Sequence, residues 1–107
     1  MYRALLIGCG NIGALYDIDD DQVLTHAKAY AQHPACSLTV FDPDKNLEAS
    51  IAAKYNALTT QEPDEATLKQ FDCVSICSPT TTHAAWLKMA MQANVKVILC
   101  EKPVSNQ

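Results

Sequence analysis

Short apolar runs recur along the chain without the strict alternation of apolar and polar positions that marks a half-exposed strand. This pattern predicts strands that are covered on both faces, as in parallel sheets. We expect strands over residues 2–7 (YRALLI), 37–42 (SLTVFD), 73–78 (CVSICS) and 95–100 (VKVILC), and a short one over 57–60 (ALTT).

The segments between these runs place apolar residues at helical spacing. They predict helices over 23–33, 46–55, 63–70 and 82–93, with Asp44 positioned to cap the second of them. The resulting order is β-α-β-α-(β)-α-β-α-β. Strands that alternate with helices indicate a parallel sheet with right-handed crossovers and helices on both faces, an α/β fold.

Composition narrows the class of protein. A chain of 107 residues forms one domain with a single modest core. Its net charge of −4 argues against a nucleic acid or an anionic membrane as partner. No apolar run approaches the roughly 20 residues of a membrane span, and the first residues lack the features of a signal peptide. We therefore expect a cytoplasmic protein.

The five cysteines do not form a recognisable framework. An odd count without short paired spacings argues against disulfides, and Cys73 and Cys77 would lie too far apart on one strand to share a bridge or a metal. Reduced core thiols are the expectation. The acidic segment 16–22 (YDIDDDQ) is either a solvated loop or a cation site, and it contains no regular ligand pattern. We therefore predict no metal centre.

The segment GCGNIG (8–13) follows the first strand directly. In that context a G-x-G-x-x-G string predicts a dinucleotide-binding turn of the Rossmann type. Gly8 would permit the tight turn, Gly10 the approach of a pyrophosphate, and Gly13 the packing of helix on strand. The amides of Asn11 and Ile12 would then lie at a helix N-terminus, where an anion is favoured. A glycine-rich turn without a ligand is the alternative.

Asp42 ends the second strand, where dinucleotide folds place an acid that binds the adenosine ribose. It follows Gly13 by 29 residues rather than the usual 20 or so, and the acidic segment accounts for the excess. A carboxylate here would repel a 2′-phosphate and favours NAD over NADP. Lys45 is a weak candidate for binding that phosphate. Asp42 could instead be only a turn residue before Pro43.

Two further segments follow predicted strands. SICSPTTTH (75–83) would lie at the switch point of the sheet, where ligands bind, with Pro79 in the turn and His83 in the next helix. Glu101-Lys102-Pro103 follows the last strand and would face the same crevice. The alternatives are a packed histidine and a surface ion pair. A methyltransferase would also have a glycine-rich loop, but the G-x-G-x-x-G spacing and the Glu-Lys-Pro sequence disfavour it.

Together these motifs resemble the Gfo/Idh/MocA family of glucose–fructose oxidoreductase and inositol dehydrogenase, in order and rough spacing along the whole chain. The resemblance implies NAD as cofactor and a hydroxyl of a sugar, cyclitol or nucleotide-sugar as the site of hydride transfer. Lys102 would be the catalytic residue, hydrogen-bonding the reacting hydroxyl and assisting proton movement. The implied cofactor-binding residues are Gly8, Gly10, Asn11, Ile12 and Gly13 at the pyrophosphate, Asp42 at the adenosine ribose, Ser78, Pro79, Thr80 and His83 at the nicotinamide, Glu101 at its ribose, and Lys102.

Two departures from the family pattern affect this reading. Residues 16–22 interrupt the first helix, so that His26 and Lys28 could face the active site. Family members also carry a second domain that binds substrate and forms the homo-oligomer. We expect this chain to be the amino-terminal Rossmann-type domain alone, a doubly wound sheet of about five strands with apolar surface exposed at its last strand. Such a domain would bind dinucleotide weakly and catalyse nothing by itself. The alternative function is an NAD-binding regulator without catalysis.

Overall fold

A computed structural model describes residues 2–8, 30–31, 33–78 and 80–100 of the chain. Five strands and three helices are assigned there: β1 (Tyr2–Ile7), β2 (Cys36–Phe41), α2 (Lys45–Tyr55), β3 (Leu58–Thr59), α3 (Glu65–Leu68), β4 (Cys73–Ile76), α4 (Thr80–Gln92) and β5 (Val97–Cys100). Of the helix expected over 23–33, Tyr30 and Ala31 are helical, and residues 23–29 and 32 lie outside the described part.

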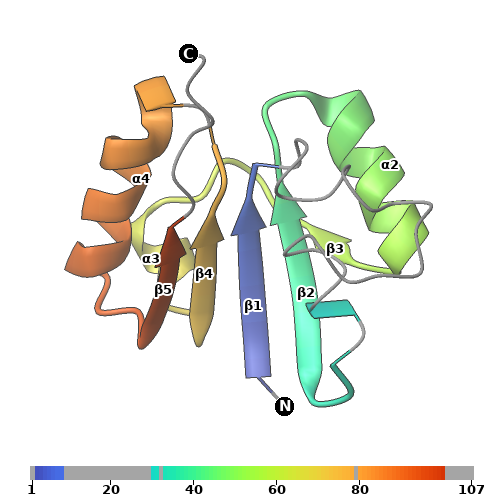
Figure 1. Cartoon of the computed structure of the whole chain (residues 1–107), viewed down its shortest axis with the longest axis horizontal. Helices are drawn as coiled ribbons and strands as arrows, with labels where there is room; N and C mark the ends of the chain where they lie inside the picture. Colours follow the sequence, from blue (N-terminus) through green and yellow to red (C-terminus); the bar gives the residue numbers. More distant parts are fainter. Residues whose placement is uncertain (1, 9–29, 32, 79, 101–107) are drawn as a thin grey trace.

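The strands form one sheet in the order β3-β2-β1-β4-β5, and every pairing is parallel. The chain runs outward from β1 through β2 to β3, then crosses β1 to add β4 and β5 on the other side (Figure 1). The point where the order reverses lies between β1 and β4. This is the doubly wound topology that the alternation of elements predicts, and the expected Rossmann-type fold is confirmed.

Each face of the sheet has its own core. Leu6 and Val40 pack with Ile51 of α2 on one face. The other face carries Leu5 and Ile7, and α3 and α4 cover it (Figure 1). The last four residues of both β1 and β2 are buried, which explains why these strands read as continuous apolar runs rather than alternating ones.

Helix ends follow local hydrogen bonding. Asp44 caps α2 as predicted, because its Oδ1 accepts hydrogen bonds from the amides of Asn46 and Leu47. The helix expected over 63–70 is shorter than predicted and spans Glu65–Leu68. Asp64, rather than Pro63, is the residue before its first turn, and it accepts a bond from the amide of Thr67.

Tyr30 packs against β4, an inner strand of the sheet. Tyr30 places its hydroxyl 3.0 Å from the Sγ of Cys73 and also against Ser75 Oγ, and burial raises the pKa of this phenol. It therefore stays protonated at neutral pH and ties its helix to β4.

At the outer edge, Val97 and Leu99 of β5 are 49% and 43% exposed, so the expected apolar exposure of this strand is confirmed.

Two sequence-based expectations concern absences. No helix in the described part of the chain is long and apolar enough to cross a membrane. The described cysteines, Cys36, Cys73, Cys77 and Cys100, are all outside disulfides. Burial raises the pKa of the Cys36 thiol, which favours its neutral form.

Candidate functional site

Strand register places the predicted site residues at one edge of the sheet. Ile7 pairs with Phe41 on one side and with Ile76 on the other, and Ile76 pairs with Cys100. The residue that follows each of these strands therefore lies at the carboxyl end of the sheet, where ligands bind in open α/β folds. Gly8, Asp42 and Cys77 occupy these positions after β1, β2 and β4.

Gly8 packs against the backbone of the neighbouring strand end. Its φ of +97° lies in the region that side chains disfavour. A Cβ added there would lie 2.7 Å from the carbonyl carbon of Cys77 and 2.8 Å from the amide nitrogen of Ser78. Glycine is therefore required for two reasons, the conformation of the turn and the close approach of β1 to β4. The sequence predicted the first, and the second is visible only in the structure.

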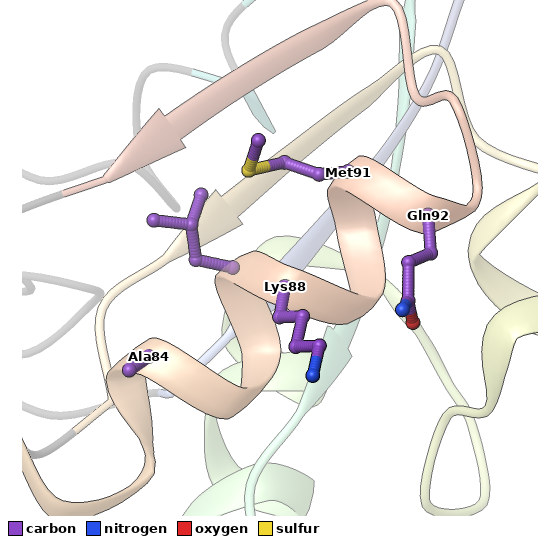
Figure 2. Close-up of a pocket in the computed structure, with 5 residues that line it drawn as sticks. Ala84, Lys88, Met91 and Gln92 are labelled. Carbon is purple, nitrogen blue, oxygen red and sulfur yellow. The ribbon is translucent and has the colours of Figure 1, made fainter.

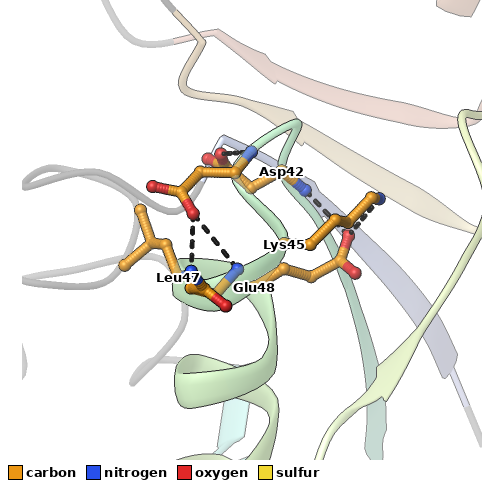
Figure 3. Close-up of polar contacts among 6 residues, drawn as sticks. Asp42, Lys45, Leu47 and Glu48 are labelled. Carbon is orange, nitrogen blue, oxygen red and sulfur yellow. Dashed lines mark hydrogen bonds and ion pairs between the residues drawn. The ribbon is translucent and has the colours of Figure 1, made fainter.

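Asp42 lies at the tip of β2 and organises the turn into α2. Its Oδ1 accepts a hydrogen bond of 2.8 Å from the amide of Asp44, as Figure 3 shows. The residue is partly exposed at the sheet edge. The turn that the sequence offered as an alternative reading is therefore present, and it coexists with a carboxylate at the position expected for ribose binding.

Glu48 is a member of this site that the sequence reading missed. Its carboxylate Oε2 accepts a hydrogen bond of 3.0 Å from the backbone amide of Asp42, and Lys45 Nζ lies 3.2 Å from the same oxygen (Figure 3). The Lys45 ammonium also lies 4.6 Å from the centre of the Phe41 ring. An acid in the first turn of a helix was the available signal, but helix-dipole compensation explains that pattern equally well.

Ser78 and His83 lie on the β4 side of the same edge. Ser78 is 8% exposed, and its hydroxyl has no hydrogen-bond partner within the described residues. His83, in the first turn of α4, places Nδ1 3.4 Å from the Ser78 carbonyl oxygen and Nε2 2.7 Å from the Sγ of Cys100. The structure thus brings these two predicted residues together at the ends of β4 and β5.

Of the remaining predicted residues, only Thr80 lies within the described part of the chain. Thr80 is the first residue of α4. The others lie outside the described residues: Gly10, Asn11, Ile12, Gly13, Pro79, Glu101, Lys102, Pro103, His26, Lys28 and the acidic segment 16–22.

Two other kinds of site could lie in the described part of the chain, a metal site and a second pocket. No group of three or more histidine, cysteine, aspartate or glutamate side chains in the described ranges is arranged to hold a metal ion. A pocket of about 380 Å³ lies along α4, lined by Ala84, Leu87, Lys88, Met91 and Gln92 (Figure 2). None of these residues belongs to the predicted cofactor site.

Comparison with known proteins agrees with the fold and the motifs. Residues 2–107 match the sequence model of the Gfo/Idh/MocA oxidoreductase family, described as having an NAD-binding Rossmann fold. The chain belongs to the Gfo/Idh/MocA family. It is thus an NAD-binding Rossmann domain of that family, and the resemblance inferred from GCGNIG, Asp42 and Glu-Lys-Pro is confirmed.

Individual relatives are oxidoreductases. UDP-N-acetylglucosamine 3-dehydrogenase from Acidithiobacillus ferrooxidans is 35% identical over 101 residues, which cover 94% of this chain and 28% of that protein. An uncharacterized oxidoreductase of Bacillus subtilis, YrbE, is 34% identical over 102 residues, which cover 94% of this chain and 27% of that protein. The chain therefore spans less than a third of the length of these relatives.

Solved structures of similar proteins also match nearly all of this chain but only about 30% of their own length. A putative myo-inositol dehydrogenase from Sinorhizobium meliloti superposes with a TM-score of 0.73 at 29% identity, over 98% of this chain and 29% of that one. A structure of the Acidithiobacillus dehydrogenase also gives a TM-score of 0.73, at 34% identity, over 97% of this chain and 30% of that one. The shared region is the nucleotide-binding fold.

Proposed function

We propose that this chain is the cofactor domain of a dehydrogenase that transfers hydride between NAD and a hydroxyl of a sugar, cyclitol or nucleotide-sugar. The observation that carries the proposal is the register, in which Gly8 and Asp42 directly follow β1 and β2, and Ser78 lies two residues after the end of β4. Two similar proteins support this class of substrate: one is named as a dehydrogenase of UDP-N-acetylglucosamine, and the other as a putative myo-inositol dehydrogenase.

The described residues fit a dinucleotide on two counts. Gly8 follows β1 directly and adopts a positive φ, which the tight turn at the start of a dinucleotide-binding loop requires. The buried Ser78 hydroxyl lacks a hydrogen-bond partner within the described chain and would gain one from a bound ligand. Gly8 and the glycine-rich segment after it would hold the pyrophosphate. Asp42 would bind the adenosine ribose, and Ser78, Thr80 and His83 would line the nicotinamide side.

In the proposed mechanism, a side chain of the protein helps to move the proton of the reacting hydroxyl. When bound, the nicotinamide accepts or returns the hydride. Lys102, two residues after the end of β5, would hydrogen-bond the reacting hydroxyl and assist the movement of its proton. Glu101 would contribute to positioning the cofactor beside it.

We further propose that residues 1–107 act with a second domain that binds substrate and forms a homo-oligomer, in the cytoplasm. The length of the relatives, of which this chain covers 27–28%, supports the second domain.

Replacing Asp42 with asparagine tests the proposed function. Asparagine keeps an oxygen that can accept the Asp44 amide, but it removes the charge that would strengthen bonds to the ribose hydroxyls. In the full-length protein we expect KM for NAD to rise about tenfold with kcat nearly unchanged, because a hydrogen bond to a charged group contributes about 1.5–3 kcal/mol. The measurement is NADH formation with sugars, cyclitols and nucleotide-sugars as substrates.

Two results would count against the proposal. A variant with lower thermal stability and an unchanged KM for NAD would leave Asp42 only its role in the turn. A wild-type protein that binds NAD but oxidises no substrate of these classes would favour the regulator that lacks catalysis.

A further inference from the structure

A polar pocket lies beside Asp42 at the same edge of the sheet. It has a volume of about 340 Å³ and is lined by Lys45, Glu48, Thr59, Thr60 and Gln61. Lys45 and Glu48 come from the first turn of α2, and the other three residues come from the end of β3 and the loop after it. An ammonium, two hydroxyls and an amide are donors that suit a phosphate monoester.

One lining group opposes an anion. Glu48 is 6% exposed, and it is the only charged residue among the buried residues of the described part of the chain. Its position is fixed by the backbone amide of Asp42, at 3.0 Å from Oε2. A carboxylate this well held lines the pocket whatever the ligand, and it repels a second negative charge.

The same carboxylate oxygen also engages the lysine of the pocket. Lys45 Nζ lies 3.2 Å from Glu48 Oε2 and 4.6 Å from the centre of the Phe41 ring, so two contacts hold the ammonium against the strand end. Because the Asp42 amide and this ammonium share one acceptor, Lys45 is held next to the residue proposed to bind the ribose. A phosphate on that ribose would therefore meet a lysine whose charge is already offset by Glu48.

We propose that Glu48 adds to the selectivity for NAD over NADP that Asp42 favours: its buried carboxylate neutralises Lys45 and so makes this pocket a poor site for the 2′-phosphate. This inference rests on the proposed function, because it requires the adenosine ribose to bind at Asp42. Glu48 acts through Lys45 and the pocket charge and is therefore a positioning residue. With Asp42 and Asp44 nearby, the site has three carboxylates and one ammonium. Glu48 is the carboxylate that both pairs with Lys45 and lines the pocket, so removing its charge has the most direct effect on an anion there.

The test is the variant Glu48→Gln in the full-length protein, titrated with NAD and with NADP by calorimetry. Glutamine keeps an oxygen for the Asp42 amide and nearly the same volume, so it changes charge rather than shape. We expect affinity for NADP relative to NAD to rise about fivefold, the scale of one partly exposed charge pair. The double variant Glu48→Gln/Lys45→Met should return the ratio to its wild-type value.

Two further variants serve as controls. Glu65→Gln removes the exposed partner of Lys69 on α3, at 3.5 Å, and should leave the ratio of affinities unchanged. Lys45→Met alone should lower the affinity for NADP relative to NAD, because it leaves the Glu48 carboxylate without the ammonium that offsets its charge. An unchanged or higher ratio in Lys45→Met would overturn the inference even if Glu48→Gln failed to fold.

The remaining outcomes separate the two proposals. If NAD binds but Glu48→Gln leaves the ratio unmoved, or weakens both cofactors equally, Glu48 only supports the turn and the selectivity role is wrong. If the wild-type protein binds neither dinucleotide, the proposed function fails and this inference fails with it.

Discussion

Replacing Gly8 with alanine is expected to destabilise the domain by about 3 kcal/mol and to abolish NAD binding in the same protein. The new Cβ would lie 2.7–2.8 Å from backbone atoms of Cys77 and Ser78, which cannot move without disturbing the β1–β4 pairing. The φ of +97° adds strain. Restricting the unfolded chain offsets only about 0.4–1 kcal/mol of this cost.

Urea denaturation measures this loss, and a second variant separates its causes. Asn94, after α4, also has a positive φ, of 58°, but already carries a side chain. Asn94→Ala should therefore cost only about 1 kcal/mol, the conformational part of the penalty. Equal losses in the two variants would show that close packing of Gly8 against β4 contributes nothing.

Replacing Lys102 with alanine should lower kcat of the full-length enzyme by about a hundredfold or more, while the dissociation constant of NAD changes little. General acid–base groups contribute roughly 10²–10⁴-fold to rate. This lysine is proposed to act chiefly on a proton of the substrate, while the other implied cofactor-binding residues hold most of the NAD molecule. NADH formation and calorimetric titration of NAD, measured on the same preparation, give the two values.

Lys96 provides a matched control for this variant. It is an exposed lysine just before β5, six positions earlier in the chain, and Lys96→Ala should leave kcat unchanged. Undiminished NADH formation in Lys102→Ala would show that the catalytic role assigned to Lys102 is wrong.

Much of the fold could be predicted from the sequence because local signals agree with the tertiary structure. The buried runs at 2–7 and 37–42 gave the central strands nearly to the residue. Asp44 predicted the start of α2 because capping depends only on neighbouring amides. The position of Asp42 at a sheet edge followed from the end of its strand.

Contacts that depend on how separate elements pack or pair could not be predicted in this way. The burial of Glu48 beneath the Asp42 amide requires α2 to lie against the end of β2, and no local pattern encodes that. The approach of Gly8 to Cys77 likewise depends on how β1 pairs with β4. The helix predicted over 63–70 begins two residues later, at Glu65, because Asp64 caps it, and it ends two residues earlier, at Leu68.

The central claim is that the carboxyl edge of the sheet binds NAD, and amide chemical shifts of the isotope-labelled 107-residue chain test it most directly. On titration with NAD, the signals of Gly8, Asp42 and Ser78 should shift together, even if binding is weak. Those of Arg3, Cys36 and Asp72, at the opposite edge, should stay in place. Shifts confined to the opposite edge, or none at millimolar NAD, would contradict the account.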